Sequence, residues 1–299
     1  MPGRTMRAVR PIPQIQHPED IIIKATYTAL CGSDLHVYRG IESAGTGFVM
    51  GHEVTGEVVG VGDAVKTVKK GDVVVSAFTT SCGTCFYCTK GFSSRCDKNT
   101  LLGCNDLDGA QAEYVRIPTQ TAQSLSPQAA SPPTAQFAAQ TVVIVGCGPV
   151  GLCALINALE YKPKHVLAVD CVPSRLELAR SLGAEPWNFK TDCEALDRRV
   201  SDPALRMGFE FLRPCGVISS VGVHNGEIPW TGSEVYGKNV TRKMGRCPVR
   251  SVSDAALEVL KRNQHLLGYA HYVLSRSSVE AYDLFNAMKV QKVIFQAAK

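Results

Sequence analysis

The sequence predicts an α/β protein of two domains, one of them a doubly wound parallel sheet. A β-branched run that begins at Thr141 passes through a glycine-rich turn directly into an apolar helical stretch, as at the start of a β–α–β unit. Upstream, four closely spaced cysteines indicate a metal-bound lobe. The chain has 299 residues, of which 45% are hydrophobic and 20% charged, so it is long enough for two separate cores.

Charge and hydropathy exclude several classes of partner. The formal net charge of +5 is small for this length and there is no long basic run, so neither a nucleic-acid nor a membrane-surface partner is predicted. Residues 1–13 lack an apolar signal core, and no stretch approaches the roughly 18 uninterrupted apolar residues of a membrane span. We therefore expect a cytosolic protein whose twelve cysteines are thiols or metal ligands.

Two short polar motifs lie beside the first predicted strands. The motif CGSDLH follows a strand-like segment at residues 20–30, and the motif GHE precedes another at 54–60. Cys31 and His52 are the thiolate and imidazole that these motifs supply, and a catalytic zinc needs a few such ligands and one open position. Taken alone, His52 is as well explained as a hydrogen-bonded structural histidine.

The first motif also carries two candidates for proton transfer. Ser33 lies two residues beyond Cys31, where its hydroxyl can take a proton from a zinc-bound group, and His36 can pass that proton onward. A plain turn role for Ser33 explains that residue equally well when it is considered alone.

The cysteine cluster is the most specific motif in the chain. Its members follow the pattern C-x2-C-x2-C-x7-C, which suits one tetrahedral Zn²⁺ in a closed structural site. These residues are Cys82, Cys85, Cys88 and Cys96. A disulfide or scattered buried thiols is the alternative, disfavoured because clustered cysteines without secretory features usually bind metal. A nucleic-acid-binding zinc ribbon normally has two separated cysteine pairs in a basic surface, and neither condition holds.

The glycine-rich turn VGCGPVG predicts a dinucleotide-binding loop. Gly146 permits the tight turn, Gly148 lets the backbone approach a pyrophosphate, and Gly151 allows close packing of helix on strand. Pro149 and Val150 complete the loop at the start of the helix, whose free N–H groups face the anion.

A second predicted strand, at residues 165–170, ends in Asp170 about twenty positions beyond the glycines. A carboxylate there can bind the adenosine ribose hydroxyls, which favours NAD over NADP. Arg175 follows closely and would soften this preference if it turned inward, although exposure is its default. A simple turn-starting role for Asp170 is the alternative.

In this order, CGSDLH, GHE, the cysteine pattern and VGCGPVG resemble the zinc-dependent medium-chain alcohol dehydrogenase family nearly end to end. Within it, the segments DLDGAQAEYVRIP, GVISSVGVHNGEIPW and MKVQKVIF are similar to the branch close to glutathione-independent formaldehyde dehydrogenases. The resemblance implies a zinc-dependent transfer of hydride between an alcohol or aldehyde and NAD.

The resemblance also implies domains and site residues. It predicts a GroES-like β-barrel catalytic domain at 1–130, completed by 248–299, and a Rossmann domain at 131–247. It assigns two zinc ions per chain, one at Cys31 and His52 with the adjacent carboxylate Glu53, the other at the cysteine cluster. Ser33 and His36 match the proton relay and Asp170 the cofactor fingerprint, while residues 221–224 lie near the nicotinamide by family position. Relatives form dimers or tetramers through a sheet edge near residues 226–240, so a homo-oligomer is expected.

Three stretches expected from the resemblance are missing. The remainder of an opening hairpin is skipped after residue 10, which would leave a barrel edge open. Residues 119–140 contain no Cys or Asp, although relatives carry their third catalytic zinc ligand there, so Glu53 becomes the candidate. No strand lies between helical segments at 193–200 and 203–212, so the sheet lacks its fourth strand and Val142–Val145 needs a new partner, for which Val217–Val221 is the candidate.

Several alternatives stay open at this point. One hypothesis for these gaps is that whole blocks of sequence were removed, either by alternative splicing or by an error in the predicted gene structure. The chain is then either an active dehydrogenase, a catalytically silent zinc- and cofactor-binding homologue, or a zinc-lobed interaction protein. Simple primary alcohols, aldehydes in a dismutation, and polyols are all open as substrates.

Overall fold

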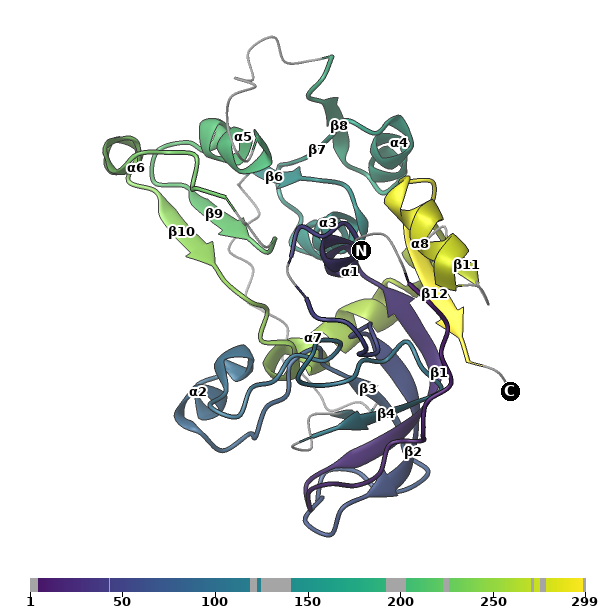
Figure 1. Cartoon of the computed structure of the whole chain (residues 1–299). Helices are drawn as coiled ribbons and strands as arrows, with labels where there is room; N and C mark the ends of the chain where they lie inside the picture. Colours follow the sequence, from purple (N-terminus) through teal and green to yellow (C-terminus); the bar gives the residue numbers. More distant parts are fainter. Residues whose placement is uncertain are drawn as a thin grey trace. The chain divides into compact units, whose positions relative to one another are not determined.

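The structure is a computed structural model, and it describes residues 5–42, 44–118, 123–124, 141–191, 203–222, 226–269, 272–274 and 278–297. The chain divides into two compact units (Figure 1). Unit 1 comprises residues 1–131, 248–262 and 270–299, and unit 2 comprises 132–247 and 263–269. Each unit is described by itself.

Unit 1 is built on a seven-stranded, mostly antiparallel sheet. Its strands are β1 (Ile21–Leu30), β2 (Val54–Val61), β3 (Val73–Ser76), β4 (Tyr114–Ile117), β5 (Gln123–Ser124), β11 (Tyr272–Leu274) and β12 (Lys292–Gln296). The order is β11-β12-β1-β2-β3-β5, and β4 pairs with β1 beside β12. β1 therefore organises the sheet, and the pairing of Thr28 with Val54 brings the end of β1 next to the start of β2.

The core of unit 1 lies on one face of this sheet. Alternating β-branched residues of β1, β2, β3 and β4 point inward and are almost fully buried, as the period of two in strands requires. They include Ile21, Ile23, Val58, Val74, Val115 and Ile117. The helices described in this unit are α1 (Gly32–Tyr38), α2 (Phe86–Thr89), η1 (Ser93–Arg95), α7 (Val249–Arg262) and α8 (Ser278–Asn286). A second cluster around Tyr282 joins α8 to the end of β1 and to α1.

Two segments, the start of the chain and residues 226–240, bear on the sheet edges considered in the sequence analysis. The described residues 5–16 form no strand, and β4 has only β1 as a partner among the described strands. Residues 226–240, near which an oligomer-forming sheet edge was expected, contain helix α6 (Gly232–Lys238), and strand β10 (Thr241–Met244) follows directly. No helix within the described ranges has the length and apolar character needed to cross a bilayer.

Unit 2 contains a three-stranded parallel sheet in the order β6-β7-β8. Its elements are β6 (Thr141–Val145), α3 (Pro149–Glu160), β7 (His165–Asp170), α4 (Pro173–Ser181) and β8 (Glu185–Asn188), with η2 (Gln264–Tyr269) also in this unit. Leu152 and Leu155 of α3 pack with Val166 and Ala168 of β7 in one buried cluster. This is the strand, turn and helix arrangement that the glycine motif predicts.

The second half of unit 2 differs from expectation. β9 (Val217–Ser220) pairs in parallel with β10 and not with β6, so the predicted new partnership between Val217–Val221 and Val142–Val145 is wrong. Instead α5 (Pro203–Phe211) packs against both β6 and β9. A helix carries its backbone hydrogen bonds internally and cannot continue a ladder, so among the described strands β6 is bonded on one edge only. The helical segment expected at 193–200 lies outside the described residues.

Gly151 offers a test of the turn in unit 2. A Cβ at this position would lie 1.7 Å from the carbonyl oxygen of Gly146, a clash with backbone that no rotamer relieves. We expect Gly151→Ala to lower the free energy of unfolding by about 2–3 kcal/mol or more, because overpacking forces the helix away from the strand. Gly148→Ala is the matched control, since nothing lies within 4 Å of its Cβ position. Urea titrations of both variants measure the difference, and equal stability would contradict the packing argument.

Candidate metal centres and cofactor site

The first candidate centre lies where β1 ends and β2 begins. Cys31 is the residue before α1, and His52 and Glu53 directly precede β2. Because Thr28 and Val54 are paired neighbours, the residues just beyond these strand ends converge. One ligand atom from each of Cys31, His52 and Glu53 lies within 4.8 Å of the others. A thiolate, an imidazole and a carboxylate at this spacing suit a zinc ion with an open position.

Asp34, which the sequence analysis did not single out, fixes both Cys31 and His52. Its Oδ2 accepts a 2.8 Å hydrogen bond from the N–H of Cys31, and its Oδ1 lies 3.3 Å from Nδ1 of His52. An Nδ1–H group that donates to a carboxylate leaves Nε2 free for a metal ion, and such outer partners orient metal-binding histidines. The signal was available in the sequence, because a carboxylate three residues after a helix-capping position commonly closes back onto it.

The protonation state of this pair follows from its surroundings. Burial of His52 lowers its pKa, but hydrogen bonds and charges from Asp34 and Cys31 outweigh burial and raise the pKa to about 10. Burial raises the pKa of Cys31, but hydrogen bonds with His52 and Ser33 and the charge of His52 outweigh it, so the pKa of Cys31 lies below its ordinary value. Each residue therefore favours the charged form of the other, and a bound metal ion would require both His52 and Cys31 to be deprotonated.

Glu53 has a second partner. Its Oε1 accepts a 2.6 Å hydrogen bond from Nζ of Lys292, which lies at the start of β12. A carboxylate has two oxygens and several lone pairs, so this ion pair leaves acceptor capacity for a metal ion. The contact joins residues 239 positions apart in sequence, which is why sequence reasoning missed Lys292.

The predicted proton-transfer residues lie on one face of α1. The hydroxyl of Ser33 is 3.3 Å from Sγ of Cys31 and 3.4 Å from Nε2 of His52, so it is adjacent to two of the metal-ligand atoms. His36 is one helical turn further along, and its Nδ1 lies 3.3 Å from Oε1 of Glu42. Residues three apart in a helix face the same side, so the structure places His36 next along the helix surface from Ser33.

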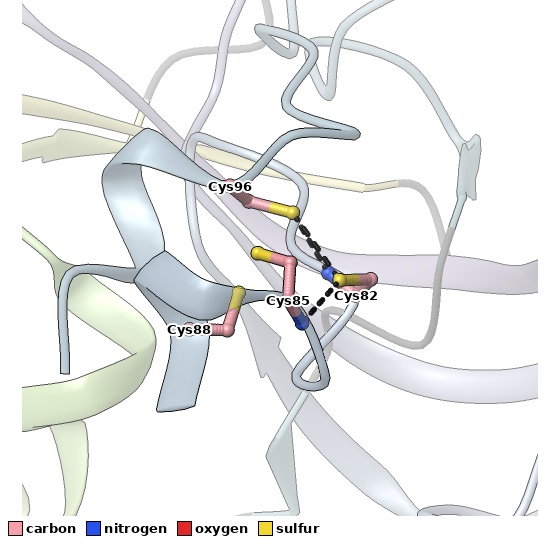
Figure 2. A group of neighbouring side chains, drawn as sticks. All are labelled: Cys82, Cys85, Cys88 and Cys96. Carbon is pink, nitrogen blue, oxygen red and sulfur yellow. Dashed lines mark hydrogen bonds between the residues drawn. The ribbon is translucent and has the colours of Figure 1, made fainter. Parts of the chain in front are cut away.

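The second candidate centre is the cysteine cluster, which Figure 2 shows as four sulfurs turned toward one another. Its members come from a loop, from α2 and from the residue after η1. One Sγ from each lies within 4.8 Å of the others, and these residues are Cys82, Cys85, Cys88 and Cys96. Gly83 and Gly91 have φ angles of +78° and +83°, a left-handed conformation that glycine adopts without steric cost.

Backbone N–H groups point at these sulfurs. Sγ of Cys96 accepts hydrogen bonds from the N–H of Cys82 at 3.2 Å and of Lys98 at 3.3 Å, and Sγ of Cys82 accepts one from Cys85 at 3.4 Å. Burial raises the pKa of Cys82, but backbone hydrogen bonds outweigh it and lower the pKa to about 6. Burial raises the pKa of Cys88 to about 12. Holding all four sulfurs as thiolates therefore calls for a cation among them. Four thiolates are a donor set that zinc prefers.

The glycine loop of unit 2 lies at the carboxyl end of β6. Gly146 has a φ angle of +94°, and Gly148 caps α3, whose first turn contains Pro149 and Val150. The carboxylate of Asp170 is nearly buried and already makes backbone contacts: Oδ2 accepts from the N–H of Cys147 at 2.7 Å. Asp170 therefore ties the end of β7 to the glycine loop, a role that the sequence analysis did not predict.

Arg175 of α4 lies on the Asp170 side of this loop. One of its terminal nitrogens is 3.8 Å from Oδ2 of Asp170, and the side chain is 21% exposed. The guanidinium thus turns inward, contrary to the exposed default. His224, which the resemblance places near the nicotinamide, lies outside the described residues.

Comparison with known proteins identifies the family. Residues 17–127 match the alcohol dehydrogenase GroES-like domain. A zinc-type alcohol dehydrogenase B from Aspergillus flavus is 61% identical over 334 residues, covering 97% of this chain and 78% of that protein. The chain belongs to the zinc-type alcohol dehydrogenase family. A medium chain reductase/dehydrogenase from Acremonium sp is another family relative, 43% identical over 76% of this chain and 92% of its own length.

Among solved structures, the alcohol dehydrogenase TADH from Thermus sp. ATN1 is similar with a TM-score of 0.84 at 29% identity, covering 98% of this chain and 96% of that one. As a zinc-type alcohol dehydrogenase, the chain has a GroES-like fold in unit 1 and a Rossmann fold in unit 2, which confirms the predicted fold class. The chain therefore belongs to a family of oxidoreductases, which confirms the predicted class of activity.

Proposed function

We propose that this chain is an NAD-dependent zinc enzyme that oxidises an alcohol to a carbonyl compound, or runs that reaction in reverse. The observation that carries the proposal is the convergence of Cys31, His52 and Glu53 within 4.8 Å, with the Ser33 hydroxyl beside the first two. Oxidation removes a hydride from the carbinol carbon and a proton from its hydroxyl, so the enzyme needs a hydride acceptor and a separate proton acceptor.

The residues of this chain fit each part of that chemistry. A zinc ion held by Cys31, His52 and Glu53 would supply the Lewis acid that lowers the pKa of a substrate hydroxyl. Ser33 accepts the substrate proton, and His36 passes it toward solvent. Asp34 keeps His52 in the orientation that presents Nε2.

The cofactor proposal rests on unit 2. The glycine loop with the N-terminus of α3 would hold the pyrophosphate of NAD⁺ through Gly146, Gly148 and Gly151, and the bound cofactor would supply the hydride acceptor. The carboxylate of Asp170 favours ribose hydroxyls over a 2′-phosphate. The inward position of Arg175 supports a weaker preference than an aspartate alone would give, because its charge offsets part of the repulsion.

Further proposals concern the chain as a whole. We propose that residues 1–130 with 248–299 form the catalytic domain and that residues 131–247 form the cofactor domain. Two zinc ions bind per chain in this proposal. The protein is proposed to be a cytosolic homo-oligomer and to belong to the formaldehyde dehydrogenase-like branch. We also propose that three internal stretches are missing. The 334-residue span of the Aspergillus flavus match, against 299 residues here, supports this. The pairing of β6 with β7 alone among the strands that the structure describes also supports it. Sequencing the transcript tests the cause: a transcript that encodes the segments would show that this chain is truncated, and one that lacks them would reject an artefact as the origin of the gaps.

A direct assay tests the function. Purified, zinc-replete protein is mixed with primary alcohols or polyols and either NAD⁺ or NADP⁺, and reduced cofactor is followed by absorbance. We expect turnover with NAD⁺ and slower turnover with NADP⁺. Cofactor binding without turnover on any alcohol or aldehyde would favour a silent homologue, and binding of neither cofactor nor zinc would reject the dehydrogenase proposal.

The role of Glu53 is tested by Glu53→Gln. The amide keeps the size of the side chain but removes the negative charge, so we expect the catalytic zinc to bind at least about 10–100-fold more weakly, the range typical when a partner that orients a metal ligand is lost. Competition with a chromophoric chelator measures the affinity. Glu42→Gln is the matched control, because Glu42 contacts His36 and no metal-ligand atom. Unchanged zinc affinity in Glu53→Gln would remove Glu53 from the metal site.

A further inference from the structure

Arg250 lies in the first turn of α7 and reaches the cysteine lobe across 169 residues of sequence. Its Nη1 donates a 2.7 Å hydrogen bond to the carbonyl oxygen of Ser81 and lies 3.3 Å from the Ser81 hydroxyl. The guanidinium also lies close over Gly83, where a Cβ would be 3.1 Å from Nη2. A side chain of α7 therefore covers the turn that contains the first metal-ligand cysteine.

The contact with Ser81 bears on the sulfurs through one peptide group. The carbonyl of Ser81 and the N–H of Cys82 belong to the same peptide unit, and that N–H donates to Sγ of Cys96 at 3.2 Å. A cation that hydrogen-bonds to the carbonyl oxygen polarises the unit and makes its N–H a stronger donor, since hydrogen bonds in a chain reinforce one another. Arg250 thus acts on Cys96 without touching it.

Charge favours the same arrangement. Four thiolates around one Zn²⁺ leave an excess negative charge, and a nearby guanidinium compensates it. Gly83, in the turn beneath the guanidinium, directly follows Cys82, so the positive charge lies over the loop that carries the first ligand. The side of the lobe that faces α7 is therefore both hydrogen-bonded and positively charged.

We propose that Arg250 is a positioning residue for the zinc of the cysteine lobe, which it stabilises by polarising the peptide between Ser81 and Cys82. The proposal requires the lobe zinc but not the dehydrogenase activity. It also links the lobe to the point at Pro248 where the chain returns to unit 1, because Arg250 is two residues beyond that point. Loss of the lobe metal would then release the start of α7.

The test uses the full chain with His52→Ala, so that the lobe is the zinc site under observation. Zinc release to a chromophoric chelator and the thiolate-to-metal charge-transfer spectrum of the cobalt-substituted protein are recorded for Arg250→Met and Arg250→Lys. We expect zinc affinity to fall about 10–100-fold in Arg250→Met, with a shifted cobalt band, because the outer shell of a metal site contributes on this scale. Arg250→Lys keeps a donor and a charge and should recover part of both.

Arg95→Met is the matched control. Arg95 is exposed, directly precedes Cys96 in sequence and carries the same charge, so its loss changes the charge of the lobe equally. We expect zinc affinity within about two-fold of the parent and an unchanged cobalt band, as for an exposed charge in water. Equal losses in Arg95→Met and Arg250→Met would overturn the proposal, as would an unchanged spectrum in Arg250→Met. A parent chain that holds no zinc in the lobe would overturn its premise.

Discussion

Replacing His52 by alanine is expected to reduce alcohol oxidation by roughly three orders of magnitude or more. Loss of Nε2 leaves Cys31 and Glu53 as the remaining ligands, too few to keep the zinc in place. Lewis-acid stabilisation contributes several kcal/mol to such reactions, and each 1.4 kcal/mol is a factor of about ten in rate. Zinc content should fall from about two ions per chain to about one, because the cysteine lobe is independent.

The measurement combines steady-state rates with metal analysis on the same preparation. His165→Ala is the matched control: His165 begins β7, is exposed and pairs with Glu185, so we expect the rate within about two-fold of the parent. Because the mutation leaves the buried Asp34 without its imidazole partner, the thermal unfolding midpoint is recorded to confirm that the protein is folded. A folded His52→Ala variant that retains both zinc ions and full activity would exclude this site from catalysis.

The sequence predicted those parts of the sites that lie close together along the chain. The cysteine lobe spans 15 positions, from Cys82 to Cys96, and its spacing alone predicts a four-sulfur site, since short loops bring such residues together in any fold. The strand, glycine turn and helix at β6 and α3 are equally local, and the structure contains them at the predicted residues.

The residues that were missed act across long sequence separations. Lys292 binds Glu53 because β12 pairs with β1, whose other edge pairs with β2, a register that no local pattern encodes. The predicted pairing partner of β6 was wrong for the same reason. The β-branched composition of β9 predicts that it is a strand, but not which sheet edge it joins. Asp34 is different, since its capping position was readable but its contact with His52 was not.

The second large effect is expected from Cys96→Ser, which should lower the free energy of unfolding of unit 1 by at least about 4 kcal/mol. Cys96 is 4% exposed, and its sulfur accepts the N–H groups of Cys82 and Lys98. Serine oxygen is a poor zinc ligand, and the binding energy of a structural zinc is folding energy, so loss of the metal removes what holds this lobe. Thermal and denaturant unfolding with parallel zinc analysis measure the effect.

Cys104→Ser is the appropriate control because it makes the same atomic change outside the cluster. Sγ of Cys104 donates to the carbonyl of Leu101 at 3.0 Å, a bond that a serine hydroxyl can also make, so we expect a loss of about 1 kcal/mol or less. Both variants replace a sulfur by an oxygen, but only Cys96 belongs to the four-sulfur set. If both lost the same small stability and both kept the lobe zinc, the four sulfurs would be packed thiols. A large loss of stability in Cys96→Ser alone, together with loss of the lobe zinc in that variant, would mean that the metal holds the lobe together.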